Sequence, residues 1–454
     1  MSGGIVERAA GQPPPLSPFQ RIWLVGRREN DGPLQATFAS FRVDGPLNVE
    51  LTQRVLAEIW RRHETLRTTV RRAGASVRLR TAADDRPDLR VVDLEGLPPA
   101  EQDAAIEEHA SEAAARVLDL AGQQAARVTL LRLDRRHHRL LLAAHPIACD
   151  ARSARLLAEE FAQRYEALAG GAGGPLPEAG ASYRDYVRSY RHWLRDGAAG
   201  RGVAYWRSEL SGLPGQLRDF GDRGPSGDGG VAAGAERIVV PESLCRALRR
   251  LAEAQGADLK TALLVAFQAL LHRHSGDGDV PVGFVVSGRR QPAARRLIGC
   301  LVNHVVLRAE FSGGSTFAEI LRQVHARRAC AAEHSVLSLH TVLRRCLGRG
   351  EGGRSGSAAS HRRLFRAVCS MRERPRLVRE FCGLVLTQLD AVEPVVSCDL
   401  ALSAARDGKA LAATLLYDRA VFSAGFAASM SRHLVNLLAA AAERPDLPVR
   451  RLPL

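Results

Sequence analysis

Strand-like and helix-like patterns alternate along nearly the whole of this chain of 454 residues, and this alternation restricts the fold more than any other feature. The run HRLLLAAH (138–145) lacks a polar face, which is typical of a strand buried on both sides. Residues 153–169 follow with apolar side chains at helical spacing. Because a single core stops growing near ~250–300 residues, we predict two mixed α/β lobes.

The same two patterns place further elements along the chain. The predicted helices are 51–66, 241–255, 257–274, 316–332 and 423–443, and the predicted strands include 280–286, 303–311, 364–371 and 382–389. Glycine-rich stretches at 170–182, 220–236 and 348–362 are predicted loops. The first of these loops separates two predicted domains, 1–175 and 176–454.

Composition narrows the class of protein. The formal net charge is +15, and only Lys260 and Lys409 among the 64 basic residues are lysines. A positive surface attracts acidic partners. Nucleic acid is not the expected partner, because the arginines are spread along the whole chain, aromatic residues make up only 5%, and no zinc-finger or RNA-binding motif is present.

The cysteine spacing and the lengths of the apolar runs indicate the cellular compartment in which the protein is expected. The eight cysteines include no CxxC pair, so the sequence predicts neither a metal site nor a disulfide framework, as in proteins of a reducing compartment. No window reaches the ~18 consecutive apolar residues of a membrane span, and the N-terminus lacks a signal-peptide core. We therefore expect a soluble, cytoplasmic protein without membrane partners.

Six separated segments carry recognisable motifs. They are LSPFQRIWLV (16–25), RRHETLRTTV (61–70), HPIACDA (145–151), SYRDYVRSYRHW with YWRSELSGLP (182–193 and 205–214), LIGCLVNHVVLR (297–308), and SCDLALSA with LLYDRAVFS (397–404 and 415–423). In order and spacing they resemble the condensation domains of nonribosomal peptide synthetases. The resemblance covers nearly the whole chain, which looks like a free-standing condensation protein or a domain cut at its edge.

The resemblance implies a fold and a reaction. The fold would be α/β, with two chloramphenicol-acetyltransferase-like lobes arranged in a V around a central tunnel. Acidic carrier proteins would present donor and acceptor on phosphopantetheine arms, and other synthetase modules would act in trans. An amine would attack the donor thioester and form an amide bond. No metal or directly bound cofactor is expected.

The segment 145–151 stands where the family carries its His-His-x-x-x-Asp-Gly signature. His145 matches the first histidine, which has a positioning role in the family. Pro146 replaces the second histidine, which acts there as general base or orients the amine. Imidazole titrates near neutral pH, whereas proline neither accepts nor donates a proton. Loss of a positioned base typically lowers a rate by ~10²–10⁴.

The rest of the signature is expected to be structural. By resemblance, Asp150 forms an ion pair with Arg67 of the RRHETLRTTV segment, which would hold the loop in place. Ala151 replaces the signature glycine and adds a Cβ at a backbone position where the glycine would serve a positive φ or the close approach of a substrate.

Other residues near the tunnel are weaker candidates for the missing base. Ser153 is predicted to cap the following helix, and Cys149 to pack as a small apolar group. Asn303 and His304 are candidate tunnel residues, but alternation along a strand points neighbouring side chains to opposite faces. None of these residues is a strong substitute, although Ala151, Ser153, Asn303 and His304 remain the candidate tunnel set.

Three functions stay open on the sequence alone. The first is a condensation enzyme that works by holding two substrates in line. The second is a catalytically silent scaffold that docks carrier proteins or a tailoring enzyme. The third is an acyltransferase that makes an ester or acylates a soluble amine. The first is favoured slightly, because Asp150, Arg67 and Asn303 match the family.

Overall fold

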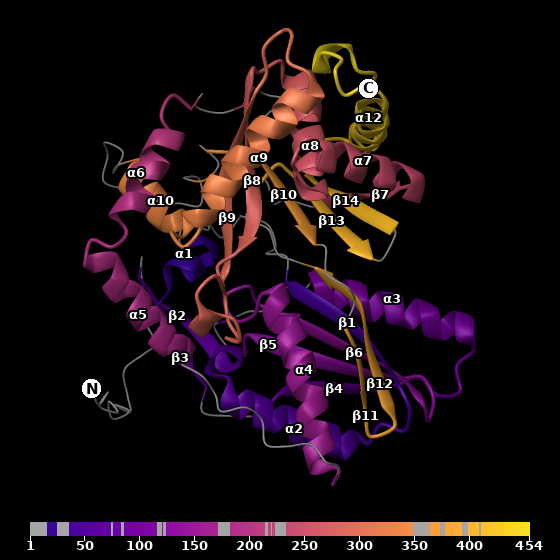
Figure 1. Ribbon diagram of the computed structural model, residues 1–454. Coiled ribbons are helices and arrows are strands. Elements are labelled where there is room, and N and C mark those ends of the chain that lie inside the picture. Colours follow the sequence, from indigo (N-terminus) through magenta and orange to yellow (C-terminus); the bar gives the residue numbers. More distant parts are fainter. Residues whose placement is uncertain are drawn as a thin grey trace.

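The computed structural model describes residues 16–24, 36–73, 76–82, 86–115, 120, 124–170, 182–213, 217–218, 220–222, 233–347, 361, 364–372, 377–392, 398–407 and 410–454. Within them the chain forms two mixed α/β lobes, one above the other in Figure 1, each built on a six-stranded sheet. The prediction of two such lobes is confirmed. Most residues of the three predicted loops lie outside the described residues.

The first lobe contains a sheet with strand order β11-β12-β1-β6-β5-β4. The strands are β11 (Val378–Phe381), β12 (Leu384–Val392), β1 (Thr37–Asp44), β6 (His137–Ala144), β5 (Ala126–Arg132) and β4 (Asp88–Asp93). The helices that pack against it or against each other are α2 (Val49–Arg62), α3 (Pro99–Ala115) and α4 (Ala151–Leu168). The apolar run that predicted a buried strand is β6, in the middle of this sheet.

The second lobe contains a sheet with strand order β7-β14-β13-β10-β8-β9. The strands are β7 (Ala233–Val240), β14 (Ala410–Asp418), β13 (Leu400–Asp407), β10 (Ala367–Arg372), β8 (Asp279–Ser287) and β9 (Val302–Glu310). The helices packed on it are α7 (Glu242–Ala254), α8 (Leu259–Ser275), α9 (Phe317–Glu333) and α12 (Ala424–Glu443). Helix α8 is buried on nearly all sides, because its apolar residues surround the helix rather than lining one face.

Smaller elements complete the fold. They are α1 (Pro18–Leu24), α5 (Tyr183–Arg195), α6 (Gly200–Glu209), α10 (Leu339–Cys346), the hairpin β2–β3 (Thr68–Ala73 and Ser76–Thr81), and the 3₁₀ turns Glu64–Arg67, Pro292–Ala294 and Val449–Arg451. Helix α5 begins with a capping box in which Ser182 and Asp185 exchange hydrogen bonds. Within the described ranges, none of the helices has the length and apolar character needed to cross a membrane.

The two lobes exchange elements along the chain. Strands β11 and β12 come from the second half of the sequence but extend the first sheet, where β12 covers the edge of β1. In the opposite direction, Phe19 and Trp23 of α1 pack in the core of the second lobe. The predicted boundary between 175 and 176 lies outside the described residues, and these exchanges show that the lobes are not two separate stretches of chain.

Candidate active site

The loop that follows β6 contains a tight turn with Pro146 at its second position. The N–H of Ala148 donates to the carbonyl of His145 at 2.9 Å, which closes a four-residue turn. Proline is favoured at this position because its fixed φ already suits the turn. The turn therefore gives Pro146 a structural role and leaves no N–H group to be satisfied there.

Contacts from several elements hold this loop. The side-chain amide of Gln20 on α1 donates to the carbonyl of Ile147 at 2.9 Å. Thr37 on β1 donates from its hydroxyl to the carbonyl of Cys149 at 2.6 Å. The ring of His145 accepts through Nδ1 from the N–H of Ile147 at 3.2 Å, and His145 is buried. The N–H of His145 donates to the carbonyl of Ala125 at 2.7 Å, so the loop is fixed on both sides of Pro146.

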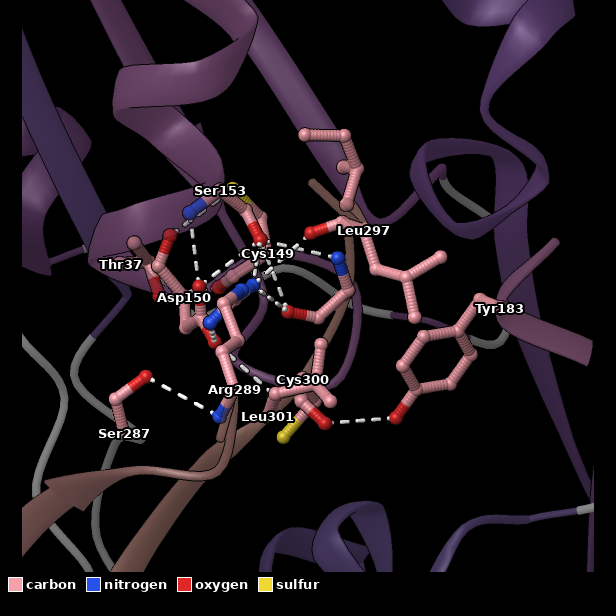
Figure 2. A network of polar contacts seen from close by, with 12 residues as sticks. Thr37, Cys149, Asp150, Ser153, Tyr183, Ser287, Arg289, Leu297, Cys300 and Leu301 are labelled. Atoms are coloured by element: carbon pink, nitrogen blue, oxygen red, sulfur yellow. Dashed lines mark hydrogen bonds and ion pairs between the residues drawn. The ribbon is translucent and has the colours of Figure 1, made fainter. Parts of the chain in front are cut away.

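Asp150 ends the loop and joins the two lobes (Figure 2). Its carboxylate is the N-cap of α4, accepting from the N–H of Ser153 at 2.8 Å. Its other oxygen, Oδ2, lies 2.5 Å from Nη1 of Arg289 and accepts from the N–H of Leu301 at 3.0 Å. Only 1% of the Asp150 side chain and 5% of the Arg289 side chain are exposed. A buried, charge-assisted contact therefore ties the loop to the segments that flank β8 and β9.

The predicted ion pair between Asp150 and Arg67 is wrong. Arg67 donates to two backbone carbonyls of its own lobe, those of Trp60 at 3.0 Å and Ala82 at 2.8 Å. It thereby ties the end of α2 to the end of β3, while Arg289 takes the carboxylate. In the sequence, Arg289 stands shortly after the end of the apolar strand β8, and this position lies outside all six motif segments.

Ser153 is part of the same network and does not cap α4. Its Oγ accepts from the N–H of Gly299 at 3.0 Å and from Nη2 of Arg289 at 2.7 Å. The same oxygen lies 2.9 Å from Oδ1 of Asp150 and 3.0 Å from the carbonyl of Gly299, so its single proton has two acceptors nearby. A hydroxyl offers one donor and two acceptor positions, so this one is fully engaged within the protein.

Ala151 is the first residue of α4. Its φ is not positive, since Cys382 is the one non-glycine residue with positive φ among those described. A Cβ is therefore accommodated without backbone strain at the position of the family's glycine.

The segment after Arg289 is held from the other side by α5. The hydroxyl of Tyr183 donates to the carbonyl of Cys300 at 2.7 Å and lies 2.9 Å from Oγ of Ser17. Burial raises the pKa of Tyr183 well above its usual value, so the phenol stays protonated and remains a donor. Figure 2 shows Tyr183 reaching this segment from the side opposite to Asp150.

Asn303 holds the connection between α9 and α10 and is not free to contact a substrate. Its amide group donates to the carbonyls of Ser335 at 2.9 Å and Leu337 at 2.8 Å. Its oxygen accepts from the N–H groups of Leu339 and His304, each at 2.9 Å. These four contacts use the two donors and two acceptor positions of the side chain. The prediction that Asn303 lines the tunnel is therefore not supported.

His304 points to the opposite face of β9, as alternation predicts, and is 2% exposed. Its ring lies beside that of Trp23, with centroids 6.2 Å apart. Burial, with a smaller effect from His361, lowers the pKa of His304 to about 3, so the ring is neutral at physiological pH. A base with so low a pKa is poorly matched to proton transfer near pH 7.

The arrangement supports positioning rather than proton transfer. The loop is fixed across both lobes, but position 146 carries no group that takes up a proton. Among the described residues, no cluster of three or more His, Cys, Asp or Glu side chains could hold a metal ion.

The comparisons of this chain with a family model and with known proteins agree on one family. The condensation domain family model matches residues 12–454. A linear gramicidin synthase protein of Brevibacillus parabrevis is 30% identical over 439 residues, which is 96% of this chain and 6% of that protein. The chain thus spans a small part of that relative.

Two solved structures share the fold. The complex of the X-domain and OxyB from teicoplanin biosynthesis has a TM-score of 0.78 at 23% identity, covering 99% of this chain and 97% of that chain. The first condensation domain of the calcium-dependent antibiotic synthetase, in complex with a substrate analogue, has a TM-score of 0.76 at 22% identity, covering 98% and 99%. The predicted fold class of two chloramphenicol-acetyltransferase-like lobes is confirmed, and the tunnel stays a prediction. By sequence and by fold, this chain belongs to the condensation domain family of nonribosomal peptide biosynthesis.

Proposed function

We propose that the protein joins a carrier-bound acyl or aminoacyl thioester to an amine, and that it accelerates this reaction by positioning. The observation that carries the proposal is the buried contact between Asp150 and Arg289, at 2.5 Å, which keeps the signature loop fixed although its second histidine is replaced by Pro146. A loop held in one geometry by both lobes is what a reaction that works by positioning requires.

The chemistry does not require an imidazole. The amine nitrogen attacks the thioester carbon, the carbon–nitrogen bond forms, and the carbon–sulfur bond breaks. The proton that the amine loses ends on the departing thiolate, whose conjugate acid has a pKa near ~8.5. Holding two reactants in line gives effective molarities up to ~10⁵–10⁸ M, equivalent to about 7–11 kcal/mol of the barrier. A general base, which supplies a rate factor of ~10²–10⁴, lowers the barrier by about 3–5 kcal/mol.

The substrates would arrive on phosphopantetheine arms of carrier proteins, which are the partners we propose, together with synthetase modules acting in trans. The net charge of +15 favours association with acidic carriers. The arms belong to the carriers, so the proposal requires no cofactor bound by this chain itself.

The test is an intact-mass assay. The protein is incubated with a donor-loaded carrier and an acceptor-loaded carrier, and the mass of each carrier is followed with time. We expect the acceptor carrier to gain the mass of the donor acyl group and the donor carrier to return to its free-thiol mass. Carriers mixed without the protein give the background rate, and equal rates with and without it would refute the proposal.

A second function is favoured by the turn at Pro146, which replaces a catalytic residue by a structural one. In that case the protein is a scaffold that docks carriers or a tailoring enzyme. One structural neighbour is an X-domain in complex with OxyB, and at 23% identity this likeness concerns the fold alone. Measurable carrier binding without any mass transfer would favour the scaffold.

A further inference from the structure

The second sheet has one covered face and one that is partly open. Helices α7, α8 and α12 lie above strands β13 and β14 in Figure 1, and the first lobe lies below them. Leu402 and Leu415, neighbours on these strands, are 0% exposed. The next residues along each strand, Ser403 and Thr414, point to the other face and are half-buried. The partly open face is therefore the one turned toward the first lobe.

Polar side chains form a row across this face. Ser370 of β10 is registered with Ser403 of β13, Ser403 with Thr414 of β14, and Thr414 with Arg237 of β7. The Oγ of Ser370 donates to the Oγ of Ser403 at 3.2 Å, which leaves the proton of Ser403 available for another acceptor. We call these four residues, with His304, the polar row.

The row continues to His304 through β8. Val368 of β10 is registered with Gly283 of β8, and Ser370 shares the face of Val368 because two residues separate them. On β8, Val285 shares the face of Gly283 and is registered with His304. With neighbouring strands ~4.8 Å apart, the polar row spans about 24 Å from Arg237 to His304.

The buried end of the polar row holds polar atoms that lack partners. The Nε2 atom of His304 and the Nε1 atom of Trp23 are both buried, and neither has a hydrogen-bond partner among the described residues. The two residues are 2% and 1% exposed. Buried polar atoms are nearly always satisfied, so a pair without partners indicates a site for a further hydrogen-bonding group.

This end also lies close to the signature loop. Leu301, whose N–H donates to Asp150, is three residues before His304, and a strand rises ~3.3 Å per residue, so their Cα atoms are at most about 10 Å apart. Gln20, one turn before Trp23 on α1, donates to Ile147 in the loop. The polar row thus runs from an exposed edge of the sheet toward the proposed reaction centre.

We propose that the polar row binds the substrate chain and selects chains that carry hydrogen-bonding groups, such as hydroxyl or amide groups, over plain alkyl chains. This inference rests on the proposed function for the nature of the substrate. An alkyl chain laid on this face would leave the hydroxyls of Ser403 and Thr414 and the atoms at His304 unpaired. Sites built to hydrogen-bond a substrate reject an analogue that lacks the matching group for this reason.

The test uses two probes that differ in one group at the far end of the chain, the pantetheine thioesters of 12-hydroxydodecanoic acid and of tridecanoic acid, in which a methyl replaces the hydroxyl. The group is placed far from the thioester because Ser403 lies three strands, or about 14 Å, from His304. Affinity for the full-length protein is measured by titration calorimetry. One additional hydrogen bond should make the hydroxylated probe bind about 5-fold more tightly. Ser403→Ala and Thr414→Val, tested singly and together, should remove this preference.

A control separates the polar row from general effects of removing a hydroxyl. Ser429 is a partly exposed residue on α12, on the covered side of the sheet, and Ser429→Ala should keep the full preference. Equal affinity for the two probes, no binding of either probe, or a preference unchanged in the folded double variant would overturn the inference. Because binding is measured without turnover, these outcomes are independent of whether the protein catalyses condensation.

Discussion

Nη1 of Arg289 lies 2.5 Å from Oδ2 of Asp150, and the two side chains come from different lobes, 139 residues apart in sequence. Both are almost completely buried. Asp150 also begins α4, so one carboxylate fixes a helix start, the signature loop and the segment that links β8 to β9. The position of the loop therefore depends on contacts made by both lobes.

Removing Arg289 should destabilise the fold strongly. In Arg289→Met the carboxylate of Asp150 stays buried without its charged partner, and breaking a buried pair in this way typically costs about 3–5 kcal/mol. Urea denaturation followed by circular dichroism measures the loss. Arg290→Met is the matched control, because Arg290 is exposed. A loss no larger than that of the control would contradict the role given to Arg289.

Arg67 should be energetically independent of Asp150. In a double-mutant cycle, Asp150→Asn and Arg67→Met should add to within about 0.5 kcal/mol, as expected of sites that share no contact. The cycle of Asp150→Asn with Arg289→Met should be non-additive, since the second change removes the charge that the first leaves unpaired. Strong coupling of Asp150 to Arg67 would restore the pair expected by resemblance.

Asn303 should matter for stability through the backbone groups that it satisfies. Asn303→Leu leaves the carbonyls of Ser335 and Leu337 and the N–H of Leu339 without this partner, so we expect a loss of at least about 2 kcal/mol. Thermal and urea denaturation both report it. Asn303→Asp should lose at least as much, because its second carboxylate oxygen would face the carbonyls of Ser335 and Leu337 in a buried site, and a loss below about 1 kcal/mol in either variant would argue against this role.

His304 should make the protein sensitive to acid. Its pKa of about 3 in the fold lies below the value of 6.5 for the unfolded chain, so the unfolded state binds the proton first as the pH falls. Stability is unaffected above pH 6.5 and declines below it by about 1.4 kcal/mol per unit, or about 2 kcal/mol by pH 5. His304→Phe should remove this share of the pH dependence of unfolding. The same slope in both proteins would show that His304 does not remain neutral.

Long helices with regular apolar spacing were predictable from the sequence. The predicted helix 316–332 is α9, Phe317–Glu333, and the predicted helix 423–443 is α12, Ala424–Glu443. Strand β1, Thr37–Asp44, was missed because its buried residues include Thr37 and Ser40, which breaks any simple alternation. Local pattern specifies an element well when packing requires one repeating face.

Contacts between distant segments were not predictable in the same way. The pairing of β12 with β1 and the contact of Arg289 with Asp150 join residues far apart in sequence, and neither leaves a periodic signal. The role of Ser153 was missed for the same reason, because most of its partners come from the other lobe. The signature residues located the site, while the fold decided which side chains hold it.

The most direct test of catalysis by positioning is the rate of acyl transfer between loaded carriers under single-turnover conditions for three proteins, the native chain, Pro146→His and Pro146→Ala. Pro146→Ala loosens the turn without adding an imidazole and so controls for the backbone change. If positioning carries the reaction, the native protein transfers the acyl group well above the background rate, and histidine at this position changes that rate by less than the ~10²-fold that a restored base would give. An inactive native protein that gains activity with histidine, but not with alanine, would contradict the account.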